Sequence, residues 1–138
     1  MGVGLFSKKK IPDGIRVQFY DGNLPGFSTN VPCQLLMTDE GLRITKIEPY
    51  TEVKLERARI LSFEIYLYER EYMAKYHSVN VTTSKAKGIE KQFYVINFLN
   101  KEGNMAHLDF WGTAFETGKI MKLQKDIQEK QNPTSYEI

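Results

Sequence analysis

The stretch that decides the fold is LLMTDEGLRI, residues 35–44, in which two apolar runs flank an acidic dipeptide and a glycine. Apolar and polar residues alternate on both sides of Asp39-Glu40-Gly41, and alternation with period two is typical of half-buried β-strands. Gly41 can supply the positive φ that a tight hairpin connection commonly requires. We therefore interpret Asp39 and Glu40 as the solvated tip of a β-hairpin. Adjacent carboxylates at an exposed tip lack the burial that separates the pKa values of a catalytic acid and base.

Alternation of this kind continues over most of the chain and predicts a mainly β domain. The loop 100–104, which contains Gly103, has the length of a hairpin connection. Turn-forming Gly and Pro residues punctuate the span 21–32, which is expected to be a loop. The predicted strands are 15–20, 33–38, 42–45, 52–55, 60–68, 76–82, 91–99 and 105–111.

The pattern changes after Gly112. Thr113 and Glu116 have the spacing of a capping box, in which the threonine caps a helix amide and the glutamate reaches back to the cap. Behind them, apolar residues recur at helical spacing. One amphipathic C-terminal helix is therefore predicted, and it ends before Pro133. Its apolar positions are Ile120, Leu123 and Ile127.

Length and composition fit one globular domain. A chain of 138 residues can bury a single core without disulfides or metals, and its one cysteine, Cys33, cannot form an internal disulfide. No apolar run approaches the roughly 20 residues that a bilayer span requires. We expect a flexible basic N-terminus over 1–14, a single domain over 15–131 and a frayed tail over 132–138, in a cytoplasmic protein.

The charge distribution argues against nucleic-acid binding. The formal net charge is +2, but residues 15–112 contain twelve Lys or Arg and twelve Asp or Glu, so the excess comes from the two ends of the chain. A phosphate backbone is bound by a sustained basic face. We therefore expect no nucleic-acid partner.

Four segments of the chain carry a resemblance to a known family: CQLLMTDEGLRI at 33–44, RILSFEIYLYER at 59–70, QFYVINFLN at 92–100 and the helical KIMKLQKDIQ at 119–128. Together they resemble the bacterial pleckstrin-homology-like (PH-like) and GRAM-like domains. The resemblance covers roughly residues 31–131 and implies a partly open barrel of two orthogonal antiparallel sheets, about seven strands in all, closed by one C-terminal α-helix. The strand at 15–20 lies outside it and is expected to be an extra N-terminal strand.

The resemblance does not carry over a phosphoinositide site. Members that bind inositides place Lys and Arg residues in and beside the first hairpin loop, where they grip the head-group phosphates. In this chain the corresponding loop is Asp39-Glu40-Gly41, followed only by Arg43 and Lys46. Two carboxylates at the mouth of such a pocket would repel phosphate.

No arrangement of residues indicates an enzyme. Cys33 shares the alternation of Leu35 and is interpreted as a buried thiol rather than a nucleophile paired with His77 or His107. His107 and Asp109 share one strand face and could hold a metal or orient a base, but no third ligand follows at a usual spacing. We therefore expect no catalytic residues, no metal site, no cofactor and no small-molecule substrate.

Aromatic residues on the predicted outward strand faces are the main candidates for an interaction site. Outward Tyr, Met and Trp are residue types enriched at protein interfaces. Alternatively, the tyrosines pack across strands or beneath the N-terminal strand. The residues expected to face the core are Leu61, Phe63, Ile65 and Leu67 in one strand and Ala106, Leu108 and Phe110 in the other. The candidate interaction residues are Tyr66, Tyr68, Tyr72, Met105, His107 and Trp111.

The sequence thus predicts a non-catalytic binding or assembly module that acts through protein contacts, with a homo-oligomer as the favoured form. The alternative is weak docking on an anionic membrane surface by the N-terminus, to which each lysine would contribute about 1 kcal/mol. The myristoylation pattern fails because Phe6 stands where Ser or Thr is required. A solvated basic tail is the simpler interpretation of the same segment. The docking residues would be Leu5, Phe6, Lys8, Lys9 and Lys10.

Overall fold

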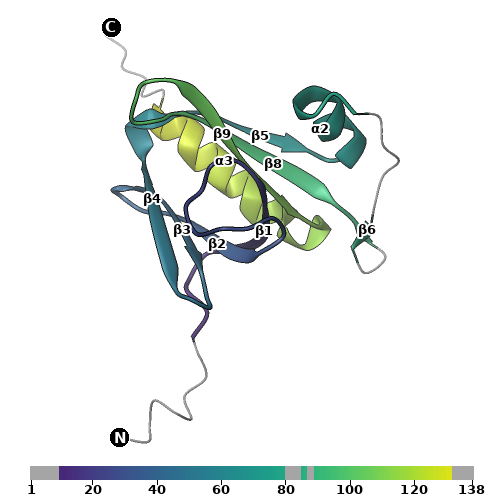
Figure 1. Ribbon diagram of the computed structural model, residues 1–138, viewed down its shortest axis with the longest axis horizontal. Coiled ribbons are helices and arrows are strands. Elements are labelled where there is room, and N and C mark those ends of the chain that lie inside the picture. Colours follow the sequence, from purple (N-terminus) through teal and green to yellow (C-terminus); the bar gives the residue numbers. More distant parts are fainter. Residues whose placement is uncertain (1–9, 80–84, 87–88, 132–138) are drawn as a thin grey trace, which may run out of the picture.

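A seven-stranded antiparallel sheet and a C-terminal helix form the computed structural model, which describes residues 10–79, 85–86 and 89–131 (Figure 1). The sheet is open, with strand order β4-β3-β2-β1-β9-β8-β5. The mainly β prediction and the C-terminal helix are therefore confirmed. The sheet strands are β1 (Ile15–Asp21), β2 (Pro32–Met37), β3 (Gly41–Lys46), β4 (Thr51–Glu56), β5 (Ile60–Tyr66), β8 (Gln92–Leu99) and β9 (Met105–Gly112). The other elements are the short pair β6 (Lys85–Ala86) and β7 (Ile89–Glu90), the 3₁₀ turns η1 (Arg57–Arg59) and η2 (Ala114–Glu116), and the helices α2 (Glu69–Tyr76) and α3 (Thr117–Gln131).

β1 joins two antiparallel meanders. It pairs with β2 on one side and with β9 on the other, so it lies in the middle of the sheet. Val17 and Phe19 point into the main core, which explains the alternation at this position. The predicted strand at 15–20 is therefore present as a central element of the sheet, and its status as an addition to a PH-like domain stays a prediction.

The hairpin around Asp39-Glu40-Gly41 is present as predicted, between β2 and β3. The Thr38 amide donates to the Gly41 carbonyl at 2.8 Å, which closes the turn. Gly41 has a φ of +149°, and a Cβ built there would lie 2.3 Å from the Leu55 carbonyl oxygen of β4. Glycine is therefore required both by the backbone conformation and by the close approach of β4.

The span 69–76 is helical, so the strand predicted at 76–82 is wrong over 76–79, the part of it that the structure describes. Two acidic residues occupy the first turn of α2, where they favour a helix N-terminus. Tyr72 and Tyr76 stand at i and i+4, so both face the sheet. Alternation of tyrosines with polar residues concealed this helical spacing.

An irregularity of register between Ile60 and Ser62 changes which residues of β5 face inward. Ile60 and Phe63 are buried in the main core, whereas Leu61 is 44% exposed. Leu67, beyond the end of β5, is also exposed. The expectation that Leu61 and Leu67 face the core is therefore wrong. The bulge turns Leu61 outward, and Leu67 lies beyond the last paired residue of the strand.

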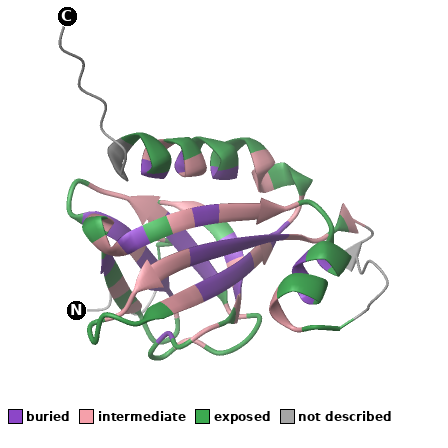
Figure 2. Cartoon of the chain, turned by 90° about the horizontal axis from the view of Figure 1, so that it is seen from above, coloured by how far each residue is buried: buried purple, intermediate pink, exposed green. Residues whose placement is uncertain are grey.

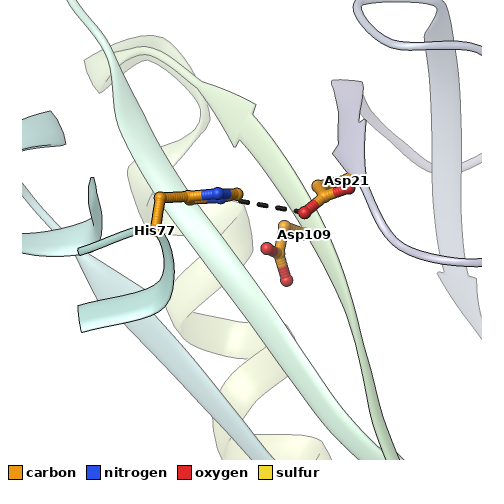
Figure 3. Close-up of side chains that lie close together, drawn as sticks. All are labelled: Asp21, His77 and Asp109. Atoms are coloured by element: carbon orange, nitrogen blue, oxygen red, sulfur yellow. Dashed lines mark ion pairs between the residues drawn. The ribbon is translucent and has the colours of Figure 1, made fainter. Parts of the chain in front are cut away.

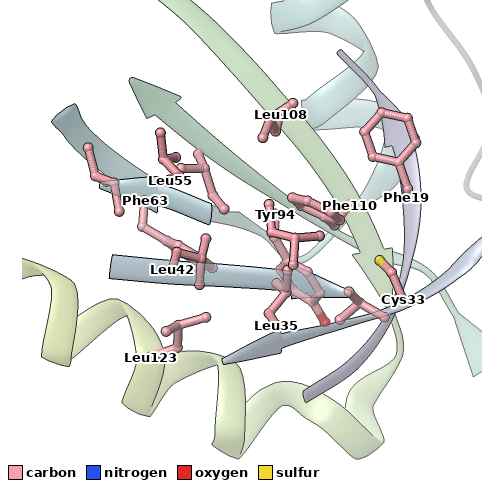
Figure 4. Packing of buried hydrophobic residues seen from close by; sticks show 14 of the residues in the cluster. Phe19, Cys33, Leu35, Leu42, Leu55, Phe63, Tyr94, Leu108, Phe110 and Leu123 are labelled. Atoms are coloured by element: carbon pink, nitrogen blue, oxygen red, sulfur yellow. The ribbon is translucent and has the colours of Figure 1, made fainter. Parts of the chain in front are cut away.

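The main core lies between the sheet and α3. Figure 2 shows the buried residues of α3 along its sheet-facing side, and Figure 4 shows Leu123 opposite the buried side chains of the strands. The predicted capping box of Thr113 and Glu116 is present, but it caps η2, which leads into α3. The helix residues of the main core are Ile120, Leu123 and Ile127.

Within the described residues, no helix combines the length and apolarity needed to cross a membrane.

Replacing Gly41 by alanine tests the hairpin. The added Cβ would collide with β4 and the backbone would keep an unfavourable φ, so Gly41→Ala should lower the free energy of unfolding by more than about 2 kcal/mol. Gly103→Ala is the matched control, because Gly103 has a φ of +83° but no heavy atom near an added Cβ; about 1 kcal/mol is expected there. Urea unfolding followed by circular dichroism measures both, and equal losses would contradict the role of the close approach.

Candidate functional site

Helix α2 covers part of the outer face of the sheet, the face opposite α3, where it packs against β5 and β8. Beneath it lies a second apolar cluster, here called the outer cluster, in which the Tyr72 ring stacks on Phe93 with centroids 4.4 Å apart. Half-buried tyrosines and Trp111 surround it. The alternative interpretation of the outward aromatics, packing rather than exposure, is therefore what the structure shows for most of them. The outer cluster consists of Tyr72, Met73, Phe93 and Val95, and its partly buried neighbours are Tyr20, Tyr66, Tyr76 and Trp111.

A fully buried carboxylate, Asp109, lies at the edge of the outer cluster. The Tyr72 hydroxyl donates to one of its oxygens, and His107 Nδ1 lies 2.6 Å from the other. Burial raises the pKa of Asp109 above its usual value and outweighs the hydrogen bonds from Tyr72 and His107, which lower it. Burial, together with the neighbouring Asp109 charge, also raises the pKa of Tyr72. Tyr72 therefore remains a protonated donor to this carboxylate.

Two further polar groups meet Asp109 from other elements. Asp21 stands directly opposite Asp109 in the β1–β9 ladder, after a register irregularity between Phe19 and Asp21. His77, at the C-terminal end of α2, has its Nε2 2.8 Å from the Tyr72 hydroxyl and 3.8 Å from Asp21 Oδ2. Figure 3 shows the three side chains converging. One ligand atom from each of Asp21, His77 and Asp109 lies within 4.8 Å of the others.

A second polar network anchors α2 to β5 and β8 through Glu64. Its carboxylate accepts from the Tyr66 hydroxyl, from the Tyr76 hydroxyl at 2.5 Å and from Lys75 Nζ at 3.2 Å. The Asn97 amide donates at 3.2 Å. Burial alone would raise the pKa of Glu64, but the hydrogen bonds prevail and lower it. The ionised form of Glu64 therefore holds the helix on the sheet.

The predicted interaction residues do not form one surface. Trp111 borders the outer cluster, and its Nε1 donates a hydrogen bond to Asn30 Oδ1 at 2.9 Å. The Tyr66 hydroxyl donates a hydrogen bond to the Glu64 carboxylate. Tyr72 is fully buried and cannot contact a partner. Tyr68 is exposed beneath the Arg70 guanidinium, whereas Met105 is exposed at the far end of β9. His107 lies between these regions, on the outer face.

The other predicted positions separate into two groups. Cys33 is a buried core residue as predicted, and burial raises the pKa of its thiol to about 12, so it is a weak nucleophile at neutral pH. Four of the five membrane-docking residues, Leu5, Phe6, Lys8 and Lys9, lie outside the described residues, and Lys10 is exposed. Membrane docking therefore stays a prediction.

Sequence reasoning missed how Asp21, His77 and Glu64 join these networks. The i, i+2 spacing predicts only that His107 and Asp109 share a strand face, and on that face their side chains are in contact. Asp21 joins only through the bulge in β1, and His77 only because residues 69–76 form a helix. No spacing along the chain signals either contact.

A cleft of about 750 Å³ lies elsewhere, beside β1 and β2. Val17 and Val31 contribute apolar lining, and Arg16 and Glu116 contribute charges of both signs. This mixture does not select one class of ligand.

Comparison with known proteins gives no family assignment: no family model matches the chain, and neither the curated proteins nor the solved structures contain a significant match. The function must therefore be argued from the geometry of the chain itself.

Replacing Glu64 by glutamine tests the anchoring of α2. Because folding lowers the pKa of Glu64, its stabilising effect is present above the ordinary value of 4.5 and is lost as pH falls through the lower folded value. Glu64→Gln should therefore lower the free energy of unfolding by about 1–3 kcal/mol at pH 7. The difference from the wild type should shrink as the pH falls below 4.5.

Urea unfolding at each pH measures this effect, and Glu71→Gln is the matched control. Glu71 is an exposed glutamate in the first turn of the same helix, where its loss should cost less than about 1 kcal/mol. A difference for Glu64→Gln that does not change with pH would contradict the role of the ionised carboxylate.

Proposed function

We propose that the chain is a non-catalytic binding module of PH-like architecture that acts through protein contacts, with a second copy of itself as the partner. In this proposal the two meanders, β1–β4 and β5-β8-β9, are the two orthogonal halves of a partly open barrel with α3 at one end. The meander order around β1 and the C-terminal helix support this arrangement.

The observation that carries the proposal is an exposed apolar patch on the outer face, beyond the reach of α2. We call it the hairpin patch, and it consists of the exposed Leu61 and Met105 and the half-buried Leu99. Leu99 and Met105 are paired across the β8–β9 ladder, and Met105 is 73% exposed. Leu61 lies in the bulge of neighbouring β5. Exposed Met and Leu side chains grouped on one sheet face are suited to a protein contact.

The surroundings of the hairpin patch favour self-association. A two-fold contact places every residue opposite the same surface of its copy, so an unbalanced charge would repel itself. Ser62, Asn97 and His107 border the patch on neighbouring strands. At the hairpin tip, Lys101 and Glu102 contribute one charge of each sign. The described residues around the patch are thus polar and balanced.

Measurement of the oligomeric state tests this function, with Met105→Glu as the disruptive variant. Burying a methionine contributes about 1.5–3 kcal/mol, and each dimer would bury two, so the variant should weaken the dimer by at least about tenfold. Light scattering after size exclusion, at several concentrations, should give a dimer for the wild type and a monomer for Met105→Glu.

Met121→Glu is the matched control, because Met121 is 50% exposed on α3, away from the hairpin patch. It should remain dimeric. A wild type that is strictly monomeric at high micromolar concentration would refute self-association. If Met105→Glu remains dimeric, the dimer contact lies on another face of the molecule and not on the hairpin patch.

A further inference from the structure

Two aspartates stand side by side on the outer face, and no lysine or arginine of the described residues forms an ion pair with either of them. Asp21 and Asp109 are directly opposite in the β1–β9 ladder, where like charges destabilise a sheet. Asp109 is fully buried, which increases the cost of its charge. Within the described residues, the ion pairs of these two carboxylates are with His77 and His107 alone. A cation between the aspartates would relieve this repulsion.

His77 supplies the third group from a different element. Its Nε2 faces Asp21 Oδ2 at 3.8 Å, and the Tyr72 hydroxyl links it to Asp109. The Asp21 and His77 side chains are 51% and 27% exposed, so an ion can reach them from solvent, whereas Asp109 is fully buried.

We propose that Asp21, His77 and Asp109 bind a divalent transition-metal ion, and that Zn²⁺ fits this set best. One imidazole and two carboxylates form a borderline set that zinc accepts, whereas magnesium and calcium prefer oxygen alone. Zinc bonds of about 2.0–2.2 Å place tetrahedral ligands about 3.5 Å apart. The present separations, up to 4.8 Å, therefore require a closure of about 1 Å by the two exposed side chains.

The neighbouring groups would orient these ligands. His107 holds one oxygen of Asp109 and the Tyr72 hydroxyl holds the other, so the carboxylate is oriented by hydrogen bonds as metal-binding carboxylates are. On metal binding, the hydrogen bond between His77 Nε2 and the Tyr72 hydroxyl would break so that Nε2 can bind the ion, while the hydrogen bond from Tyr72 to Asp109 would remain. The bound ion would join the C-terminal end of α2 to β1 and β9.

Zinc titration of the full chain, freed of metal with EDTA, tests the proposal by calorimetry and by the melting temperature. The wild type should bind one Zn²⁺ and melt at a higher temperature in its presence. Asp21→Asn and His77→Gln should each weaken binding by more than about tenfold, because loss of an orienting neighbour alone costs about that much. Calcium at the same concentration should leave the melting temperature unchanged.

Asp21→Asn gives a second signature that a purely structural network would not produce. Without metal it removes the repulsion from Asp109 and should melt above the wild type, yet it should lose the zinc-induced shift. Asp39→Asn, which removes the same charge at the exposed hairpin tip, should bind zinc like the wild type. A wild type that binds no zinc at millimolar concentration would overturn the proposal. So would variants at Asp21 and His77 that bind zinc unchanged.

Discussion

Four consecutive residues of β8, Phe93–Ile96, have no exposed surface, and most of the structure follows from this burial on both faces of one strand. Tyr94 and Ile96 belong to the main core under α3, whereas Phe93 and Val95 belong to the outer cluster under α2. A strand of an antiparallel sheet usually leaves one face to solvent. Because β8 does not, a second covering element on the outer face is obligatory, and α2 is that element.

α2 is only eight residues long, and its apolar contacts are supplemented by carboxylates on the sheet. Glu64 and Asp109 each accept a hydrogen bond from a tyrosine of the helix. Tyrosine suits this position because its ring packs on the outer cluster while its hydroxyl reaches a polar partner. The pKa values of the two carboxylates shift in opposite directions. Hydrogen bonds lower the pKa of Glu64, whereas burial raises the pKa of Asp109.

Strand β1 sets the position of Asp21. Because β1 lies between β2 and β9, it pairs directly with β9, and the irregularity before Asp21 places that carboxylate opposite Asp109. A regular ladder would have presented a different residue there, since each step of register reverses the side-chain direction. The same kind of irregularity in β5 exposes Leu61, one strand beyond the Leu99–Met105 pair. Two bulges thus define both the aspartate pair and the hairpin patch.

The sequence by itself determined the features that depend on neighbours along the chain. The hairpin at Asp39-Glu40-Gly41, the outward direction of Met105, the capping box and the apolar stripe of the C-terminal helix all follow from turn chemistry and from periods of 2 and 3.6 residues. Only the tertiary structure decided the central place of β1, the helical fold of 69–76 and the meeting of Asp21, His77 and Asp109. These depend on bulges and on contacts between distant segments, which shift a side chain to the opposite face without leaving a periodic signal.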